Sequence, residues 1–161
     1  MTEEQQHQQN EAFVEPPGDE IPGISRQHVA AMEGSDADEV WVMAGMRHVL
    51  LRTVGRRSGK EHKVALPYWS DPNGHRVVVG SFAGAPQHPS WYLNLTDRSA
   101  NPELLVNDQG RRFWAHAQVL GDAEYDKMWA GLIEDRPFYA NYQTRTDRRI
   151  PLVRLVEIRP A

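Results

Sequence analysis

Short β-rich runs separated by turn residues dominate the central and C-terminal parts of this 161-residue chain. The run 76–81 contains three consecutive valines, which is typical of a strand buried on both faces. Short turns join several neighbouring runs, so we expect antiparallel pairing in a meander and not βαβ crossovers. The pattern predicts an α+β, mainly β fold, an antiparallel barrel of five to six strands with short peripheral helices. The predicted strands are 47–54, 63–70, 76–81, 103–107, 111–120 and 152–158.

Short helices are expected before the first strand and between later ones. The clearest has Asp122 as its N-cap and ends at Pro137. Four apolar residues at helical spacing form its core stripe, namely Tyr125, Met128, Trp129 and Leu132. Pro89 suits the first position of another helix. The predicted helices are 25–33, 35–44, 90–97, 122–136 and 138–143.

The first 23 residues differ in composition from the rest of the chain. They hold six acids and no Lys or Arg, together with several prolines and glycines, which is typical of a disordered tail. We therefore predict a tail over 1–23 and a single domain over 24–161. Removing six of the 22 acids leaves 16 acids against 18 Lys and Arg in the domain. This weak positive charge makes nucleic acid an improbable partner.

The compartment and the available chemistry are limited by what the sequence lacks. There is no cysteine, which excludes disulfides and thiolate chemistry. The first residues do not resemble a signal peptide, and no apolar run approaches the roughly 20 residues that span a bilayer. The expected localisation is cytoplasmic. Val40, Trp41 and Ala44 form an apolar stripe that we interpret as core, so contact with a membrane surface is not indicated.

A basic loop over 55–63 is the strongest candidate for binding. Four cations crowd it, Arg56, Arg57, Lys60 and Lys63, against the single acid Glu61. Such charges repel one another unless an anion lies among them, and Gly55, Ser58 and Gly59 allow backbone and hydroxyl contacts to phosphate oxygens. We interpret the loop as an anion cradle; the alternative is a solvated hairpin turn. It is no nucleotide-binding P-loop, because Glu61 stands where that motif needs Ser or Thr.

Other catalytic classes find less support. The histidines His62, His75, His88 and His116 show no metal-ligand spacing, so no metal site is expected. The Gly-x-Ser-x-Gly elbow of serine hydrolases is absent. Tyr139 and Tyr142 share one helix face, and Tyr68 ends a strand. Each phenol could donate a hydrogen bond to a developing oxyanion or simply pack in the core.

Three composite motifs occur in a specific order. They are Leu51-Arg52-Thr53-Val54-Gly55-Arg56-Arg57-Ser58-Gly59, Gly84-Ala85-Pro86-Gln87-His88-Pro89-Ser90-Trp91-Tyr92-Leu93-Asn94-Leu95 and Tyr139-Ala140-Asn141-Tyr142-Gln143-Thr144-Arg145-Thr146-Asp147-Arg148-Arg149-Ile150-Pro151. In sequence and spacing the chain resembles the deazaflavin (F-420)-dependent nitroreductase family, over about residues 46–158. These proteins are actinobacterial F-420-dependent reductases, and the resemblance implies an FMN-binding split-barrel-like fold.

The resemblance also implies the site. Arg56, Arg57, Ser58 and Gly59 would bind the cofactor phosphate, and a later segment would lie along the deazaflavin. The implied cofactor-binding residues are Arg56, Arg57, Ser58, Gly59, His62, Ser81, Phe82, Ala83, Gly84, Ala85, Pro86, Trp91 and Asn94. The implied substrate-side residues are Tyr68, Ser81, Tyr139 and Tyr142. Three positions depart from the family. His62 and Phe82 replace cations, which weakens the phosphate site, and Arg136 replaces a third tyrosine, which argues against nitroimidazole activation.

The predicted function is hydride transfer from reduced coenzyme F-420 to a small electron-poor acceptor. Quinones and other conjugated carbonyl compounds are the expected acceptors, and reduction of nitro compounds would be incidental. FMN is the less favoured cofactor. The rival hypothesis is a non-catalytic barrel that binds an anionic flavin-like cofactor or haem.

Overall fold

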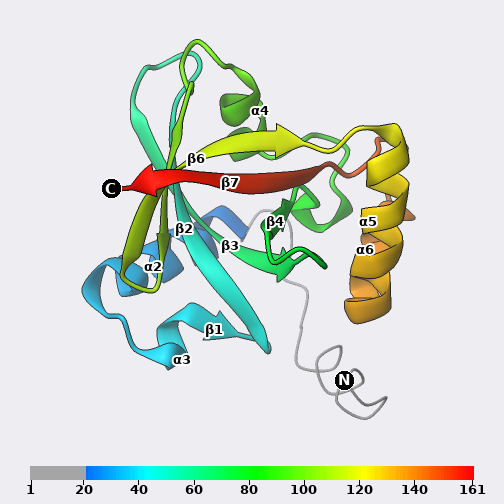
Figure 1. The fold of residues 1–161 in the computed structure, drawn as a ribbon, viewed down its shortest axis with the longest axis horizontal. Coiled ribbons are helices and arrows are strands. Elements are labelled where there is room, and N and C mark those ends of the chain that lie inside the picture. Colours follow the sequence, from blue (N-terminus) through cyan, green and yellow to red (C-terminus); the bar gives the residue numbers. More distant parts are fainter. Residues whose placement is uncertain (1–20) are drawn as a thin grey trace.

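A closed antiparallel barrel of six strands forms the body of the molecule (Figure 1). The computed structural model describes residues 21–161. Sheet order is β2-β3-β4-β7-β6-β5, and β5 pairs back with β2 to close the barrel. The strands are β2 (Met46–Val54), β3 (Glu61–Ser70), β4 (Arg76–Val79), β5 (Leu104–Asp108), β6 (Arg111–Val119) and β7 (Leu152–Pro160). The predicted mainly β split barrel is confirmed.

The topology is only partly the expected meander. β2, β3 and β4 follow one another as antiparallel neighbours, and β5 and β6 form a hairpin. The last strand, β7, lies between β4 and β6, where it pairs Val78 with Val153 and Ala117 with Leu155. In β4, burial of Val77, Val78 and Val79 confirms that this strand is covered on both faces.

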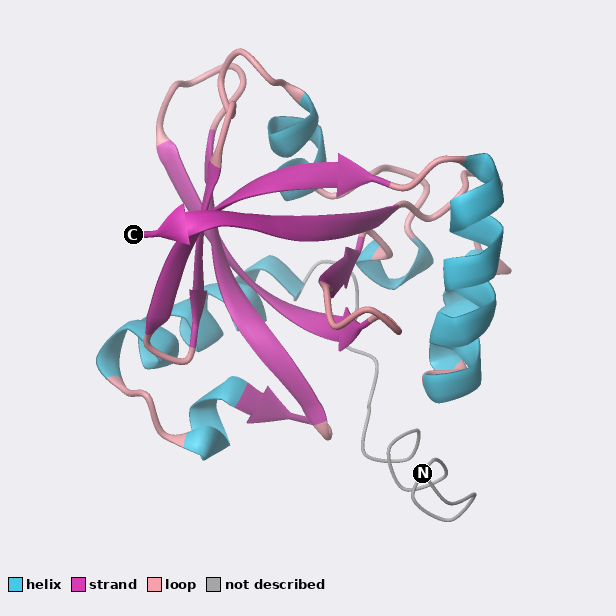
Figure 2. Ribbon diagram, in the orientation of Figure 1, coloured by secondary structure: helices cyan, strands magenta, loops and turns pink. Residues whose placement is uncertain are grey.

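Two apolar cores lie on opposite sides of the barrel wall. The barrel core inside contains Val49, Leu51, Leu104, Phe113 and Val153. The outer core lies between the wall and α5 (Asp122–Asp135) with α6 (Phe138–Gln143), which stand beside the barrel (Figure 2). The predicted stripe of α5 contributes Tyr125, Met128 and Leu132 to this second core, with Trp129 packed at its border.

Two shorter elements cover other parts of the barrel. α4 (Ser90–Thr96) packs Trp91 and Leu95 into the barrel core. α2 (Ile21–Gly34) covers the outer face of β3 and of β2 through Val29 and Met32, which pack with Trp41 and Leu50. Trp41 is almost fully buried, as the prediction of a core position requires, and Val40 packs against the same cluster, whereas Ala44 lies beyond the helix. None of the described helices is both long and apolar enough to span a bilayer.

Several boundaries differ from the sequence predictions. α2 begins at Ile21, so the predicted tail loses 21–23 to the helix; Pro22 is tolerated because first-turn N–H groups need no intrahelical partner. The rest of the tail, 1–20, lies outside the described residues. The predicted helix 35–44 is wrong: α3 spans only Asp38–Trp41. Ala44 and Gly45 have positive φ, 52° and 73°, and form a tight turn that pairs β1 (Val42–Met43) with β2.

Two predicted helix starts are displaced by one residue. Gly121, not Asp122, is the N-cap of α5, and the Asp122 carboxylate accepts from Arg149 instead. Pro89 is the N-cap of α4, not its first helical residue. Its own N–H group is missing, so Pro89 fits the position just outside the helix as well as the first position inside it.

His48 makes folding sensitive to acid. Its Nδ1 donates to the Met46 carbonyl at 3.0 Å, and the ring lies 4.9 Å from that of His28. Burial lowers the pKa of His48 to about 4. The neutral form is favoured in the folded state, so its stabilisation is complete above pH 6.5 and is lost towards pH 4. At pH 5 the free energy of unfolding should have fallen by about 2 kcal/mol from this group.

Urea unfolding of the wild type and His48→Gln at pH 7.5 and pH 5 isolates this contribution. The glutamine amide can still donate to the carbonyl but does not titrate. The difference between the two proteins should shrink by about 2 kcal/mol at the lower pH. Equal pH dependence in both proteins would contradict the assignment.

Candidate functional site

The basic loop is an ordered hairpin connection between β2 and β3. The Gly55 N–H donates to Lys60 O at 2.7 Å, and the Gly59 N–H donates to Gly55 O at 2.9 Å. Gly59 has φ +68°, a conformation that other residues rarely adopt. Ser58 Oγ accepts the Lys60 N–H at 3.2 Å. The hydroxyl predicted to bind phosphate therefore also shapes the turn that presents Arg57 and Lys60 to solvent.

Gly55 is needed for close approach and not for a special backbone angle. A Cβ at this position would lie 2.5 Å from Ser58 Oγ and 2.8 Å from His62 Nε2. The imidazole of His62 therefore lies against the base of the loop, beside Ser58. This is the position where the resemblance would place a cation.

A buried amide anchors the loop to α4. Asn94 Oδ1 accepts both the backbone N–H of Arg56, at 3.2 Å, and its Nη1, at 2.8 Å. Asn94 Nδ2 donates to Thr53 Oγ1 at 3.2 Å, and the residue is only 2% exposed. Asn101 adds a second buried amide, which accepts the Val54 N–H at 2.7 Å. The side-chain oxygen of Asn94 is thus fully used in holding Arg56.

The four loop cations do not share one environment. Lys63 donates to Glu33 at 2.9 Å and lies 3.4 Å from Glu61, so acids already neutralise it. It faces a groove of about 640 Å³ on the outside of the barrel, which is lined in part by Met32 and Glu33 of α2 and not by Asn94. Arg56, Arg57 and Lys60 are left as the cations of the loop itself.

The segment after β4 forms a left-handed turn. Phe82, Ala83 and Gly84 have φ of 45°, 53° and 77° in succession, within the 3-10 turn η1 (Phe82–Gly84). A Cβ on Gly84 would lie 2.6 Å from the carbonyl oxygen of Tyr142. The predicted cofactor segment and the predicted substrate-side helix α6 are therefore brought into close contact by a residue without a side chain.

Tyr139 and Tyr142 are neighbours in the outer core. Their rings meet edge to face with centroids 6.0 Å apart, and both are nearly buried. Burial raises the pKa of Tyr139, against the opposing effect of the Arg136 guanidinium, to which it is hydrogen-bonded. Burial also lowers the pKa of Arg136, and its Nη1 has no hydrogen-bond partner within the described chain.

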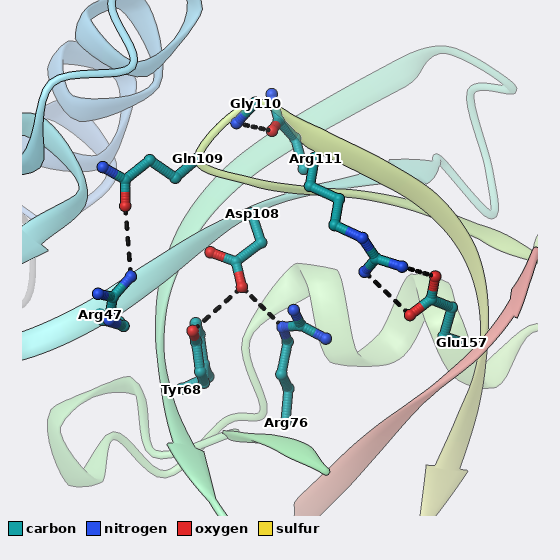
Figure 3. Close-up of polar contacts among 9 residues, drawn as sticks. Arg47, Tyr68, Arg76, Asp108, Gln109, Gly110, Arg111 and Glu157 are labelled. Carbon is teal, nitrogen blue, oxygen red and sulfur yellow. Dashed lines mark hydrogen bonds and ion pairs between the residues drawn. The ribbon is translucent and has the colours of Figure 1, made fainter. Parts of the chain in front are cut away.

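Tyr68 lies in the other core, inside the barrel (Figure 3). Its hydroxyl donates to Asp108 Oδ2 at 3.1 Å, and Arg76 Nε donates to the same oxygen at 2.8 Å. Burial, followed by the charge of Asp108, raises the pKa of Tyr68. The hydroxyl of Tyr68 is therefore already engaged by a carboxylate. Tyr68 thus packs in a different core from Tyr139 and Tyr142, although Tyr68 and Tyr139 both act electrostatically on the Arg136 guanidinium.

Three partners at these sites were not predicted from the sequence. Asp108 and Asn101 accept hydrogen bonds from Tyr68 and from the Val54 N–H. Arg148, which contacts the segment after β4, was noted only as a letter of the third motif. None shows a distinguishing local pattern, since each acts on residues at least 32 positions away or on backbone atoms. Within residues 21–161, no three His, Asp or Glu side chains gather as a metal site.

Comparison with known proteins identifies the family of the chain. Residues 24–157 match the family model described as F420H(2)-dependent quinone reductase. An F420H(2)-dependent quinone reductase of Mycobacterium tuberculosis is 34% identical over 108 residues, covering 65% of this chain and 70% of the relative.

Two solved structures are similar in both sequence and fold. An F420-H2 dependent reductase is 38% identical with a TM-score of 0.55, and the match covers 67% of this chain and 92% of that one. A protein described as a domain-swapped dimer is 34% identical with a TM-score of 0.58, over 81% and 95% of the two chains.

Proposed function

This chain belongs to the F420H(2)-dependent quinone reductase family, and on that premise we propose that it uses coenzyme F-420 to reduce a quinone. The supporting observation is the basic loop, which Asn94 fixes to α4 through both the backbone and the side chain of Arg56. Other conjugated carbonyl compounds are secondary acceptors in this proposal, and nitro compounds are incidental ones. The cytoplasm is the proposed location.

The residues present fit an anionic, elongated cofactor. Arg57 and Lys60 are exposed and cationic, and Arg56 is held in place beside them. These three side chains would bind the phosphate, with Ser58 and Gly59 supplying the turn. The left-handed turn at Phe82–Gly84 follows β4 and lies against α6 at Tyr142, and it would lie along the deazaflavin. The replacements at His62 and Phe82 are thus offset in part by Lys60.

Two electrons and two protons must reach the quinone to give the quinol. When bound, reduced F-420 supplies a hydride. Tyr139 and Tyr142 would act on the acceptor side, where a phenol hydroxyl can donate to an oxygen that gains negative charge. Burial raises the pKa of Tyr139, so this hydroxyl keeps its proton at neutral pH. The Arg136 guanidinium, which is hydrogen-bonded to Tyr139, would favour negative charge near that hydroxyl. The second proton comes from solvent or from a tyrosine hydroxyl.

Two measurements test the proposal. Fluorescence titration should show saturable binding of oxidised F-420 and weaker binding of FMN at the same salt concentration. Adding a quinone such as menadione to the protein with reduced F-420 should then oxidise the cofactor with multiple turnovers. Tight binding without turnover with any quinone would favour the non-catalytic barrel. Preference for FMN would discard the cofactor assignment.

The double variant Tyr139→Phe/Tyr142→Phe should lower quinone turnover by about 100-fold, because it removes two donors from the acceptor site while keeping both rings. The dissociation constant for F-420 should stay within about threefold of the wild type, since phosphate contacts are intact. Tyr125→Phe is the matched control, because its hydroxyl donates to Ile150 O at 2.6 Å in the same core. Unchanged turnover in the double variant would remove both tyrosines from the mechanism.

A further inference from the structure

Arg148 makes an unusual set of contacts around the turn that follows β4. Its Nε donates to Ala85 O at 2.9 Å, Nη1 donates to Gly80 O at 3.0 Å, and Nη2 donates to Ser81 O at 2.8 Å. Nη1 also lies 3.1 Å from Nδ1 of His88. The guanidinium thus reaches both ends of the turn and the start of the segment that leads to α4.

Each of these acceptors is uncharged. Three are backbone carbonyl oxygens, and the fourth is an imidazole nitrogen. Burial, followed by the charge of Arg148, lowers the pKa of His88, which keeps its ring neutral and able to accept. The planar fork of Arg148 is therefore matched to backbone geometry and not to an opposite charge.

The turn itself needs such support. Two residues with side chains, Phe82 and Ala83, adopt positive φ, which clashes sterically with the Cβ atom. Only two backbone hydrogen bonds run within the turn, from Gly84 to Ser81 and from Ala85 to Phe82. A strained backbone of this kind persists only where the surrounding structure determines it, and such segments are concentrated at binding sites.

The contacts also connect the turn to two other parts of the site. The ring of His88 packs on Tyr92 of α4, with centroids 4.7 Å apart. On the other side, Arg145 Nη1 donates to Ala83 O at 3.4 Å, next to the close approach of Gly84 to Tyr142. Arg148 lies in the connection between α6 and β7, so it joins this connection to the turn and to α4.

We propose that Arg148 is the positioning residue that holds the Ser81–Ala85 turn in its cofactor-binding conformation by donating to the carbonyls of Gly80, Ser81 and Ala85. The claim that the turn binds the cofactor rests on the proposed function. The claim that Arg148 holds the turn in its conformation does not. Without the guanidinium, the turn should relax from its left-handed form while the barrel stays folded. Arg148 touches no reacting atom in this account.

Hydrogen exchange of the cofactor-free protein tests the conformation directly. In Arg148→Ala, amide exchange over 80–85 should accelerate at least about tenfold, whereas exchange in β2 and β6 should not change. Arg149→Ala is the matched control, since the neighbouring Arg149 pairs with the exposed Asp122. Equal exchange over 80–85 in the wild type and Arg148→Ala would overturn the proposal.

Binding of oxidised F-420 gives the second measurement. The dissociation constant should rise about 30-fold in Arg148→Ala, and millimolar guanidinium chloride should restore much of the affinity while ammonium chloride should not. No change in affinity would overturn the proposal. If the wild type does not bind F-420 at all, the proposed function fails, and the exchange experiment still decides the role of Arg148.

A second variant distinguishes loss of the turn conformation from a general folding defect. Arg148→Gln keeps two N–H donors and a shorter reach, so its exchange rate and affinity should fall between those of the wild type and the alanine variant. If Arg148→Ala does not fold, Arg148→Gln with wild-type exchange and affinity would overturn the proposal.

Discussion

Replacing Arg56 and Arg57 together by alanine should raise the dissociation constant for F-420 by about 100-fold or more. A hydrogen bond to a charged group contributes about 1.5–3 kcal/mol, and each 1.4 kcal/mol is a tenfold change in affinity. The lower end applies here, because Arg57 is exposed and Arg56 is half-buried. Arg56 should carry the larger share, since Asn94 already holds its guanidinium in one place.

Loss of net charge alone must be excluded as the cause. The double variant Arg26→Ala/Lys127→Ala removes the same charge from exposed positions on α2 and α5. Its affinity for F-420 should stay within about twofold of the wild type at 0.15 M salt, where distant charges are screened. Salt should weaken binding of the wild type more steeply than binding of Arg56→Ala/Arg57→Ala. Equal affinities in the two double variants would show that the loop is a solvated turn.

Asp71→Ala should lower the free energy of unfolding by about 3–5 kcal/mol. The Asp71 carboxylate is fully buried and accepts the N–H groups of Asn73, at 2.9 Å, and of His75, at 3.0 Å. It also accepts Nε of Arg154, at 3.1 Å, whose side chain is 8% exposed. Burial alone would raise the pKa of Asp71, yet these donors outweigh it and the pKa is lowered.

The cost is large because two kinds of group lose their partner at once. The turn between β3 and β4 loses its acceptor for two N–H groups, and a buried guanidinium on β7 is left without the carboxylate. Arg154 keeps contacts with Gln118 and Glu124, which limit the loss. Since small domains are stable by only about 5–15 kcal/mol, the variant should unfold at a much lower urea concentration.

Urea denaturation of the wild type, Asp71→Ala and Asp122→Ala tests this expectation. Asp122 also pairs with an arginine, but its side chain is 95% exposed. The surface pair should contribute less than about 1 kcal/mol. A loss in Asp71→Ala no larger than in Asp122→Ala would show that the buried pair does not stabilise the fold.

Local sequence patterns were sufficient for most of the elements. Alternation along 111–119 places Phe113, Ala115 and Ala117 inside the barrel, as the pattern predicts, because side chains of a strand point to opposite faces in turn. Prediction failed at 35–44, where an apolar stripe resembled a helix. Positive φ at Ala44 and Gly45 turns the chain back on β2 there, and only the glycine signals such a turn.

The candidate site was predicted less completely than the fold. Loop composition identified Arg56 and Arg57 as an anion site, and the motifs identified the family. No local sequence pattern indicated that Glu33 would neutralise Lys63 or that Tyr68 would donate to Asp108. Nor did any pattern indicate that Asn94 would bind Arg56. Each partner lies 30 or more residues away in the sequence.

The sequence by itself determined the strands, the basic loop between two of them, and the family. These depend on side-chain alternation, turn residues and charge density, which act over a few neighbouring positions. Tertiary structure alone decided that β5 pairs with β2 and that β7 lies between β4 and β6. It also decided that Arg148 donates hydrogen bonds to the turn after β4. Pairing across the barrel and bonds to backbone carbonyls depend on positions in space, and any residue type supplies the same carbonyl oxygen.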